Sequence, residues 1–158
     1  MSTAERKAFS WKRCPGSIRI FIIAYIFCVL FGAVSSYFQF ESLRVQIMEA
    51  LSISNIPRDI SVYAMILLRV CAALAILAWV LLRYSLIGRL LIGIQLIIWV
   101  YGAPTAIGIL AKGSFNALPF LLSGLSLAVA VASLVVKNSR LWFARKGVTL
   151  ADDLDTFS

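Results

Sequence analysis

The stretch "DISVYAMILLRVCAALAILAWVLLRY", residues 59–84, decides the fold class, because it is long and apolar enough to cross a lipid bilayer. A helix rises 1.5 Å per residue, so about 20 apolar residues span a hydrocarbon core ~30 Å thick. Three other runs of this kind are present, which predicts transmembrane helices at about 20–40, 60–82, 87–110 and 116–136. We expect an all-α polytopic membrane protein that folds as a four-helix bundle.

The composition supports this class independently of any motif. Hydrophobic residues make up 61% of the 158 residues, and the mean hydropathy is +0.94. Soluble domains are only about 45–50% apolar. The chain is therefore expected to form a single transmembrane domain (1–158), with a basic leader at 1–19 and a tail at 137–158.

Lysine and arginine positions predict the orientation in the membrane. Cations gather before the first span, between the second and third, and after the fourth: Arg6, Lys7, Lys12, Arg13, Arg19, Arg83, Arg89, Lys137, Arg140, Arg145 and Lys146. The other two loops carry only Arg44, Arg58 and Lys112. By the positive-inside rule, both termini are cytoplasmic, in an inner (plasma) membrane. The net charge of +8 then reflects topology and attraction to anionic lipids, and it requires no nucleic-acid partner.

Arg69 is an ionisable residue deep within the second span. A central arginine costs about 2.5–3.5 kcal/mol on an insertion scale, which the surrounding Leu, Ile and Val residues offset. Projecting its depth onto the neighbouring spans gives a candidate polar site of Arg69, Tyr101, Thr105, Ser35, Ser36, Ser123 and Ser126. Two interpretations of Arg69 remain open. In the structural one, its side chain packs against these polar groups or extends (snorkels) to the headgroups. In the functional one, it is the positive element of a solute or ion path, or it binds an acidic group of a partner.

Two patterns concern helix packing. Gly124, Ala128 and Ala132 recur at every fourth position of the last span, a spacing that lets helix backbones approach within one chain or between copies. In "WVYGAPTAIG", Pro104 removes a backbone donor and predicts a helix break or kink in the third span.

The segments outside the spans allow two further predictions. In the first outer loop, Leu43, Ile47 and Leu51 recur at helical spacing, which predicts a short amphipathic helix that caps the bundle or recognises an external partner. The tail begins with the basic, aromatic "KNSRLWFARKG", expected at the inner headgroups with Trp142 as an interfacial anchor. It continues as the acidic "VTLADDLDTFS", a flexible tail or a docking motif.

Residues for catalysis are scarce. The chain contains no histidine, and its three cysteines do not have metal-ligand spacing. Neither a phosphate loop nor a nucleophile elbow occurs. We expect no enzymatic activity, no metal and no cofactor.

The four spans and the exit motif of Ser139, Arg140, Trp142 and Phe143 resemble the small four-helix inner-membrane proteins of bacteria. Bacteriocin-immunity proteins are similar in size and topology, and that resemblance implies action by contact with another protein in the membrane.

These observations favour a non-enzymatic integral membrane protein that binds another membrane protein, as an assembly partner or an immunity-like inhibitor. The alternative is a small oligomeric transporter or channel subunit with an anion-friendly path near Arg69, Tyr101 and Pro104. The expected partners are membrane lipids and either a protein partner or further copies of the chain.

Overall fold

A computed structural model describes residues 14–39, 58–83 and 86–144 of the chain. Its elements are α1 (Gly16–Phe38), α3 (Arg58–Arg83), α4 (Leu86–Ala111), the short 3-10 helix η2 (Phe115–Ala117), α5 (Leu118–Val135) and α6 (Lys137–Ala144). Four of the helical segments are long and apolar enough to cross a membrane: Gly16–Phe38, Tyr63–Leu82, Leu86–Ala111 and Phe115–Val135. The all-α fold with four membrane-spanning helices is thereby confirmed.

Helices α3 and α4 extend the expected spans by one or two residues at each end, α5 lies within the expected 116–136, and α1 begins four residues before the apolar run at 20–40. Pro15 precedes it, and its carbonyl oxygen accepts the Ile18 and Arg19 amide hydrogens. The amphipathic helix expected in the first outer loop, most of the basic leader and the acidic end of the tail lie outside the described residues.

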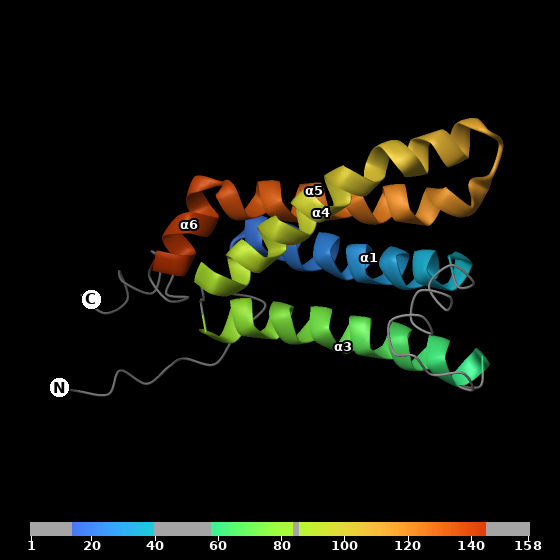
Figure 1. Ribbon diagram of the computed structural model, residues 1–158. Helices are drawn as coiled ribbons and strands as arrows, with labels where there is room; N and C mark the ends of the chain where they lie inside the picture. The colour runs from blue at the N-terminus through green and yellow to red at the C-terminus, as the bar shows by residue number, and fades with distance from the viewer. Residues whose placement is uncertain (1–13, 40–57, 84–85, 145–158) are drawn as a thin grey trace, which may run out of the picture.

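The four long helices alternate in direction and form a ring in which α1 contacts α3 and α5, and α4 contacts the same two helices (Figure 1). Within the most apolar window of each helix, 33% of the residues are buried in α1 and in α5, against 11% in α3 and in α4. The α1–α5 pair is therefore the centre of the bundle, and α3 and α4 present most of their surface outward.

Small residues explain why α1 and α5 pack most closely. Lipid is as apolar as a leucine side chain, so helices associate in membranes through close van der Waals contact between small side chains. The buried small residues are Ala24, Gly32, Ser35 and Ser36 in α1, and Ser123, Gly124, Ala130 and Ser133 in α5. The hydroxyls of Ser36, Ser123 and Ser133 each donate to a carbonyl oxygen of their own helix, so their burial leaves no donor unpaired.

A glycine near the start of α4 allows close contact with α3, and a glycine after its last turn ends the helix. Gly88 lies against the fully buried Val80 of α3, and a Cβ there would stand 2.6 Å from the Val80 Cγ2 atom. At the other end, Gly113 has a φ of 82°. Its amide hydrogen bonds to the Leu110 carbonyl oxygen, and the Ser114 amide bonds to the Ile109 carbonyl oxygen. This is the Schellman arrangement, which ends a helix with a glycine in the left-handed region.

Helices α4 and α5 are joined by two reciprocal aromatic–glycine contacts. The Trp99 indole of α4 occupies the space that a Cβ on Gly124 would fill, and the Phe120 ring of α5 lies where a Cβ on Gly102 would be 2.8 Å from its Cζ atom. The two rings stack with centroids 6.1 Å apart, and Trp99 Nε1 donates to the Phe120 carbonyl oxygen at 2.9 Å.

These contacts revise the small-residue stripe expected on the last span. Gly124 is buried and receives an indole ring rather than a second backbone, Ala128 is half-buried, and Ala132 is exposed. The three residues therefore do not share one packing role. Spacing indicates which residues share a helix face, but the large side chains of the neighbouring helix decide what that face accepts.

Helix α4 continues from Leu86 to Ala111 across Pro104, so the proline does not break the helix, and the kink expected there stays a prediction. A proline removes a single backbone donor, and membrane helices tolerate this loss when the residues on both sides continue the helix.

The first part of the expected tail folds back onto the bundle as α6. Val136 adopts an extended conformation, with φ −58° and ψ 141°, which ends α5 and redirects the chain. Within α6, Ser139 is fully buried, and its hydroxyl hydrogen-bonds to the Ser17 hydroxyl at 2.7 Å and to the Ser133 carbonyl oxygen at 2.6 Å. Helix α6 therefore closes the end of the bundle at which α1 begins (Figure 1).

The aromatic residues of α6 belong to the core. Trp142 is 4% exposed and Phe143 5%, and both join the buried cluster that contains Cys14 and Ile18. The Arg89 guanidinium lies 4.6 Å from the centre of the Phe143 ring. The expectation of Trp142 as an interfacial anchor is therefore wrong, because its indole covers the end of the bundle instead of lying among headgroups.

Candidate binding cavity at Arg69

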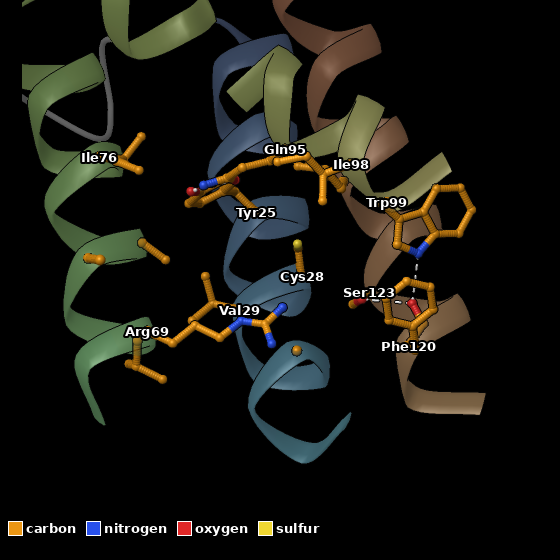
Figure 2. A pocket seen from close by; sticks show the side chains of 15 residues that line it. Tyr25, Cys28, Val29, Arg69, Ile76, Gln95, Ile98, Trp99, Phe120 and Ser123 are labelled. Carbon is orange, nitrogen blue, oxygen red and sulfur yellow. Dashed lines mark hydrogen bonds between the residues drawn. The ribbon is translucent and has the colours of Figure 1, made fainter. Parts of the chain in front are cut away.

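A cavity of about 280 Å³ lies inside the ring of helices, and all four long helices contribute to its wall. Its lining consists of Tyr25, Cys28, Val29 and Gly32 from α1; Arg69, Val70, Ala72, Ala73 and Ile76 from α3; Gln95, Ile98 and Trp99 from α4; and Phe120, Ser123 and Leu127 from α5. Figure 2 shows Arg69 reaching from α3 toward α1, with Tyr25 and Gln95 at one end of the cavity. Most of the wall is apolar, so its few polar groups define what it can recognise.

The cavity is partly open, and its exposed lining residues lie on α3 and α4. Arg69 and Ala72 of α3 are exposed, and Ile98 of α4 is 65% exposed. Because these two helices are the least buried members of the ring, the opening faces the lipid that surrounds a membrane-spanning bundle. A molecule dissolved in the bilayer can thus reach the wall without passing through either end.

Arg69 is held against α1 by one hydrogen bond. Its Nη1 donates to the Ser36 hydroxyl oxygen at 2.7 Å, and Ser36 in turn donates to the Gly32 carbonyl oxygen at 2.9 Å. The other terminal nitrogen, Nη2, lies over Gly32, where a Cβ would be 3.6 Å away. Gly32 therefore leaves room for the flat guanidinium, and Ser36 fixes its direction.

A second polar pair lies at the opposite end of the cavity. The Tyr25 hydroxyl of α1 donates to Gln95 Oε1 of α4 at 3.2 Å. Tyr25 is only 1% exposed, so this bond satisfies a hydroxyl that would otherwise be buried without an acceptor. The Gln95 amide nitrogen keeps two donor hydrogens, which adds to the donors at this wall.

The polar lining contains more hydrogen-bond donors than acceptors. A guanidinium has five N–H donors, and among the described residues Ser36 is the acceptor that Arg69 reaches. The hydroxyl hydrogen of Ser123 is already directed to the Phe120 carbonyl oxygen, as is the Trp99 indole N–H. No aspartate or glutamate occurs in residues 16–38, 63–82, 86–111 or 115–135. The positive charge at this depth thus lacks a carboxylate partner from any of the four spans.

The structure brings together part of the expected polar site. Ser36 bonds to Arg69, and Ser123 lines the same cavity. Ser35 is buried beside Ser36, but its hydroxyl accepts a hydrogen bond from Gln39 instead. Ser126 is half-buried and does not line the cavity.

The other two members of the expected site face away from Arg69. Tyr101 is 82% exposed, and Thr105 is exposed as well. Both residues were expected at this site because their depth in the membrane matches that of Arg69. Depth does not fix the direction of a side chain, because successive residues of a helix are rotated by about 100°. Because Trp99 points into the bundle, Tyr101 lies about 200° further around α4 and points outward.

Several residues of the cavity were not predicted from the sequence. Tyr25 and Cys28 were not recognised as lining residues, although Tyr25, Cys28, Gly32 and Ser36 follow the i, i+3, i+7, i+11 spacing of one helix face. That spacing was the available signal. Trp99, which also lines the cavity, contacts α5 through the hydrogen bond from its indole N–H to the Phe120 carbonyl oxygen.

Comparisons with protein-family models, with curated proteins and with solved structures found no match. The chemistry of the cavity must therefore be argued from its own residues. Among the described residues, no group of three histidine, cysteine, aspartate or glutamate side chains could hold a metal ion. The groups that are present can hold an anion by hydrogen bonds and charge, next to an apolar surface.

Proposed function

We propose that this protein is a non-enzymatic integral membrane protein that acts by binding another membrane protein, as an assembly partner or an immunity-like inhibitor. The supporting observation is the outward face of α4. Gly93, Ile97, Tyr101, Pro104 and Gly108 fall within an arc of about 80° on that helix, on the side opposite Gln95 and Trp99.

This face differs from an ordinary lipid-facing surface. Tyr101 is 82% exposed and lies within one helical turn of the middle of α4, where a hydroxyl finds neither water nor headgroups. Leaving such a group without a hydrogen-bond partner in an apolar medium is costly. A neighbouring protein that supplies an acceptor removes this cost.

The glycines of the same face leave room for that neighbour. A Cβ built on Gly93 or on Gly108 would meet no atom within 4 Å. Glycines on an outward helix face allow a second helix backbone to approach closely, as small residues do in membrane helix pairs. The face thus combines a close-approach surface with an exposed hydroxyl.

Gly108→Leu tests the proposal, because Gly108 is exposed and a Cβ at this position meets no atom within 4 Å. The variant should fold like the wild type and lose a co-purifying or cross-linked membrane protein, whether a different chain or a second copy. Ala132→Leu, at an exposed position of α5, is the matched control and should retain that partner. A complex that survives Gly108→Leu and Tyr101→Phe unchanged would refute binding through this face.

The inner-membrane location and the cytoplasmic placement of both termini belong to the same proposal. Their support is the arginine and lysine distribution, with eleven of the fifteen cations in the leader, the second loop and the tail. A reporter that fluoresces only in the cytoplasm, fused after Ser158, should be bright. A periplasm-dependent phosphatase fused at the same point should be inactive.

The second candidate is a small oligomeric transporter or channel subunit with an anion-friendly path, and the cavity that reaches Arg69 is the observation in its favour. Tyr101 and Pro104 are absent from the lining, so such a path would involve Gln95 and Ser123 instead. Chloride or phosphate efflux from vesicles that contain the protein, abolished by Arg69→Gln, would support this candidate over protein binding.

A further inference from the structure

We propose that the cavity at Arg69 binds an anionic lipid, meaning an apolar chain that carries a phosphate or carboxylate group. This site is separate from the outward face of α4, because Gln95 and Trp99 line the cavity from the opposite side of that helix.

The charge of the bound group follows from the polar lining. The Arg69 guanidinium uses one of its five N–H donors on Ser36, and no carboxylate is present in residues 16–38, 63–82, 86–111 or 115–135. Phosphate and carboxylate oxygens are the acceptors that match several N–H donors, and a guanidinium binds them by charge and by paired hydrogen bonds. An anionic group is therefore the natural complement of this wall.

The apolar part of the ligand follows from the rest of the lining. Val29, Val70, Ile76, Ile98 and Leu127 supply aliphatic surface, and Trp99 and Phe120 supply two stacked rings. An inorganic anion would leave this surface without a partner. A lipid chain covers it and extends through the opening between Ala72 and Ile98 into the bilayer.

The size of the cavity favours a lipid over an inserted helix of another protein. A volume of about 280 Å³ is near the lower limit of small-molecule pockets, ~300 Å³. A helix with its side chains is about 10–12 Å wide, so it could enter only if α3 moved away from α4. A headgroup oxygen cluster followed by a flexible chain needs no such movement.

The test compares three probes on the whole protein in a neutral maltoside detergent: dodecyl phosphate, dodecanol and inorganic phosphate. Isothermal titration should give saturable binding of one dodecyl phosphate. Dodecanol has the same chain without the charge and should bind at least tenfold more weakly, and inorganic phosphate at the same concentration should give no saturable binding. Equal affinities for dodecyl phosphate and dodecanol would overturn the proposal. If inorganic phosphate binds as tightly as dodecyl phosphate, the ligand is a free anion and the lipid proposal is overturned as well.

Variants locate the site. Arg69→Gln should weaken dodecyl phosphate binding at least tenfold, whereas Arg140→Gln, which removes the same charge from an exposed position of α6, should leave it unchanged. An equal loss in both variants would contradict a site at Arg69, because it would reflect net charge alone.

A second pair of variants keeps Arg69 intact, in case Arg69→Gln does not fold. Ala72 is exposed and lies at the opening, so Ala72→Phe should obstruct it and weaken binding at least tenfold. Ala78→Phe adds the same ring at an exposed position of α3 outside the cavity and should have no effect. A membrane protein partner lost on Arg69→Gln but retained on Gly108→Leu would assign the guanidinium to a partner's carboxylate and overturn the lipid.

Discussion

Trp99 lies directly over Gly124, and its indole occupies the volume that any larger residue at position 124 would require. The same indole donates its N–H to the Phe120 carbonyl oxygen. One side chain thus fixes both the distance between α4 and α5 and their register along the bundle. The wall of the cavity depends on this contact, because Trp99 and Phe120 both belong to it.

Gly124→Ala should destabilise the bundle by about 1–3 kcal/mol, the usual cost of overpacking a closely packed site. Unfolding in a fixed detergent, followed by circular dichroism, measures the loss. Gly93→Ala is the control, since a Cβ there meets nothing within 4 Å, and it should be neutral or slightly stabilising. Combining Gly124→Ala with Trp99→Leu should recover part of the stability. Independent, additive effects of the two substitutions would show that the indole does not rest on this glycine.

Ser36→Ala should release the Arg69 guanidinium from α1, because Ser36 is its hydrogen-bond acceptor among the described residues. Side-chain hydrogen bonds between membrane helices average about 0.6 kcal/mol and reach about 1.7, so we expect a loss of roughly 1 kcal/mol, measured as above. In the Arg69→Gln background, the same substitution should cost less. Ser126→Ala, at a half-buried position outside the cavity, provides the control. Equal costs in both backgrounds would mean that Ser36 does not stabilise Arg69.

Cys14 reports on the closure of the bundle by α6. Burial raises the pKa of the Cys14 thiol above its usual range, and the nearby Arg19 charge partly opposes that shift. In a variant with Cys28 and Cys71 replaced by alanine, maleimide labelling of Cys14 should be slow at neutral pH, because the thiol is 5% exposed and the thiolate is the reactive form. Trp142→Ala, which removes a large side chain from the buried cluster that contains Cys14, should speed labelling at least tenfold. Equally fast labelling with and without Trp142 would contradict the closed arrangement.

The raised pKa of the Cys14 thiol leads to a second prediction, that the stability of the protein depends on pH. A raised pKa means that the folded state favours the neutral thiol, so its contribution is complete below the unfolded value, about 8.5, and declines as the pH rises through the folded value. The stability difference between the protein and its Cys14→Ala variant should therefore be constant from about pH 6 to 8 and shift against the cysteine form above that. A difference that stays constant to pH 10 would be inconsistent with a buried, neutral Cys14.

The positions of the long helices could be predicted from the sequence, whereas the directions of several side chains could not. Span length and hydropathy were sufficient for the four long helices, because crossing a bilayer requires an apolar segment of nearly fixed length. Depth counting placed Ser36 among the six candidate neighbours of Arg69, and the structure joins these two residues by a hydrogen bond. The same counting failed for Tyr101 and Thr105, because height along a helix does not fix its rotation about its axis.

The other differences between expectation and structure arise from the rotation of each helix about its axis and from the side chains that it meets on neighbouring helices. Gly124 accepts an indole because Trp99 happens to face it from α4, and nothing in the local pattern of α5 specifies that partner. Trp142 and Phe143 are buried because the Ser139 hydroxyl hydrogen-bonds to Ser17 of α1 and to the Ser133 carbonyl oxygen of α5, and these bonds hold α6 against the bundle. These outcomes depend on residues far apart in the chain.

Local composition by itself determined that this chain has four segments long and apolar enough to cross a membrane, with Arg69 deep inside one of them, since the energy of placing each residue in lipid depends mainly on that residue. The tertiary structure alone decided that Arg69 meets Ser36 and a donor-rich cavity, that Tyr101 faces outward, and that α6 closes one end. Those features follow from how four helices rotate and pack against one another, which is set by contacts between side chains that no single segment contains.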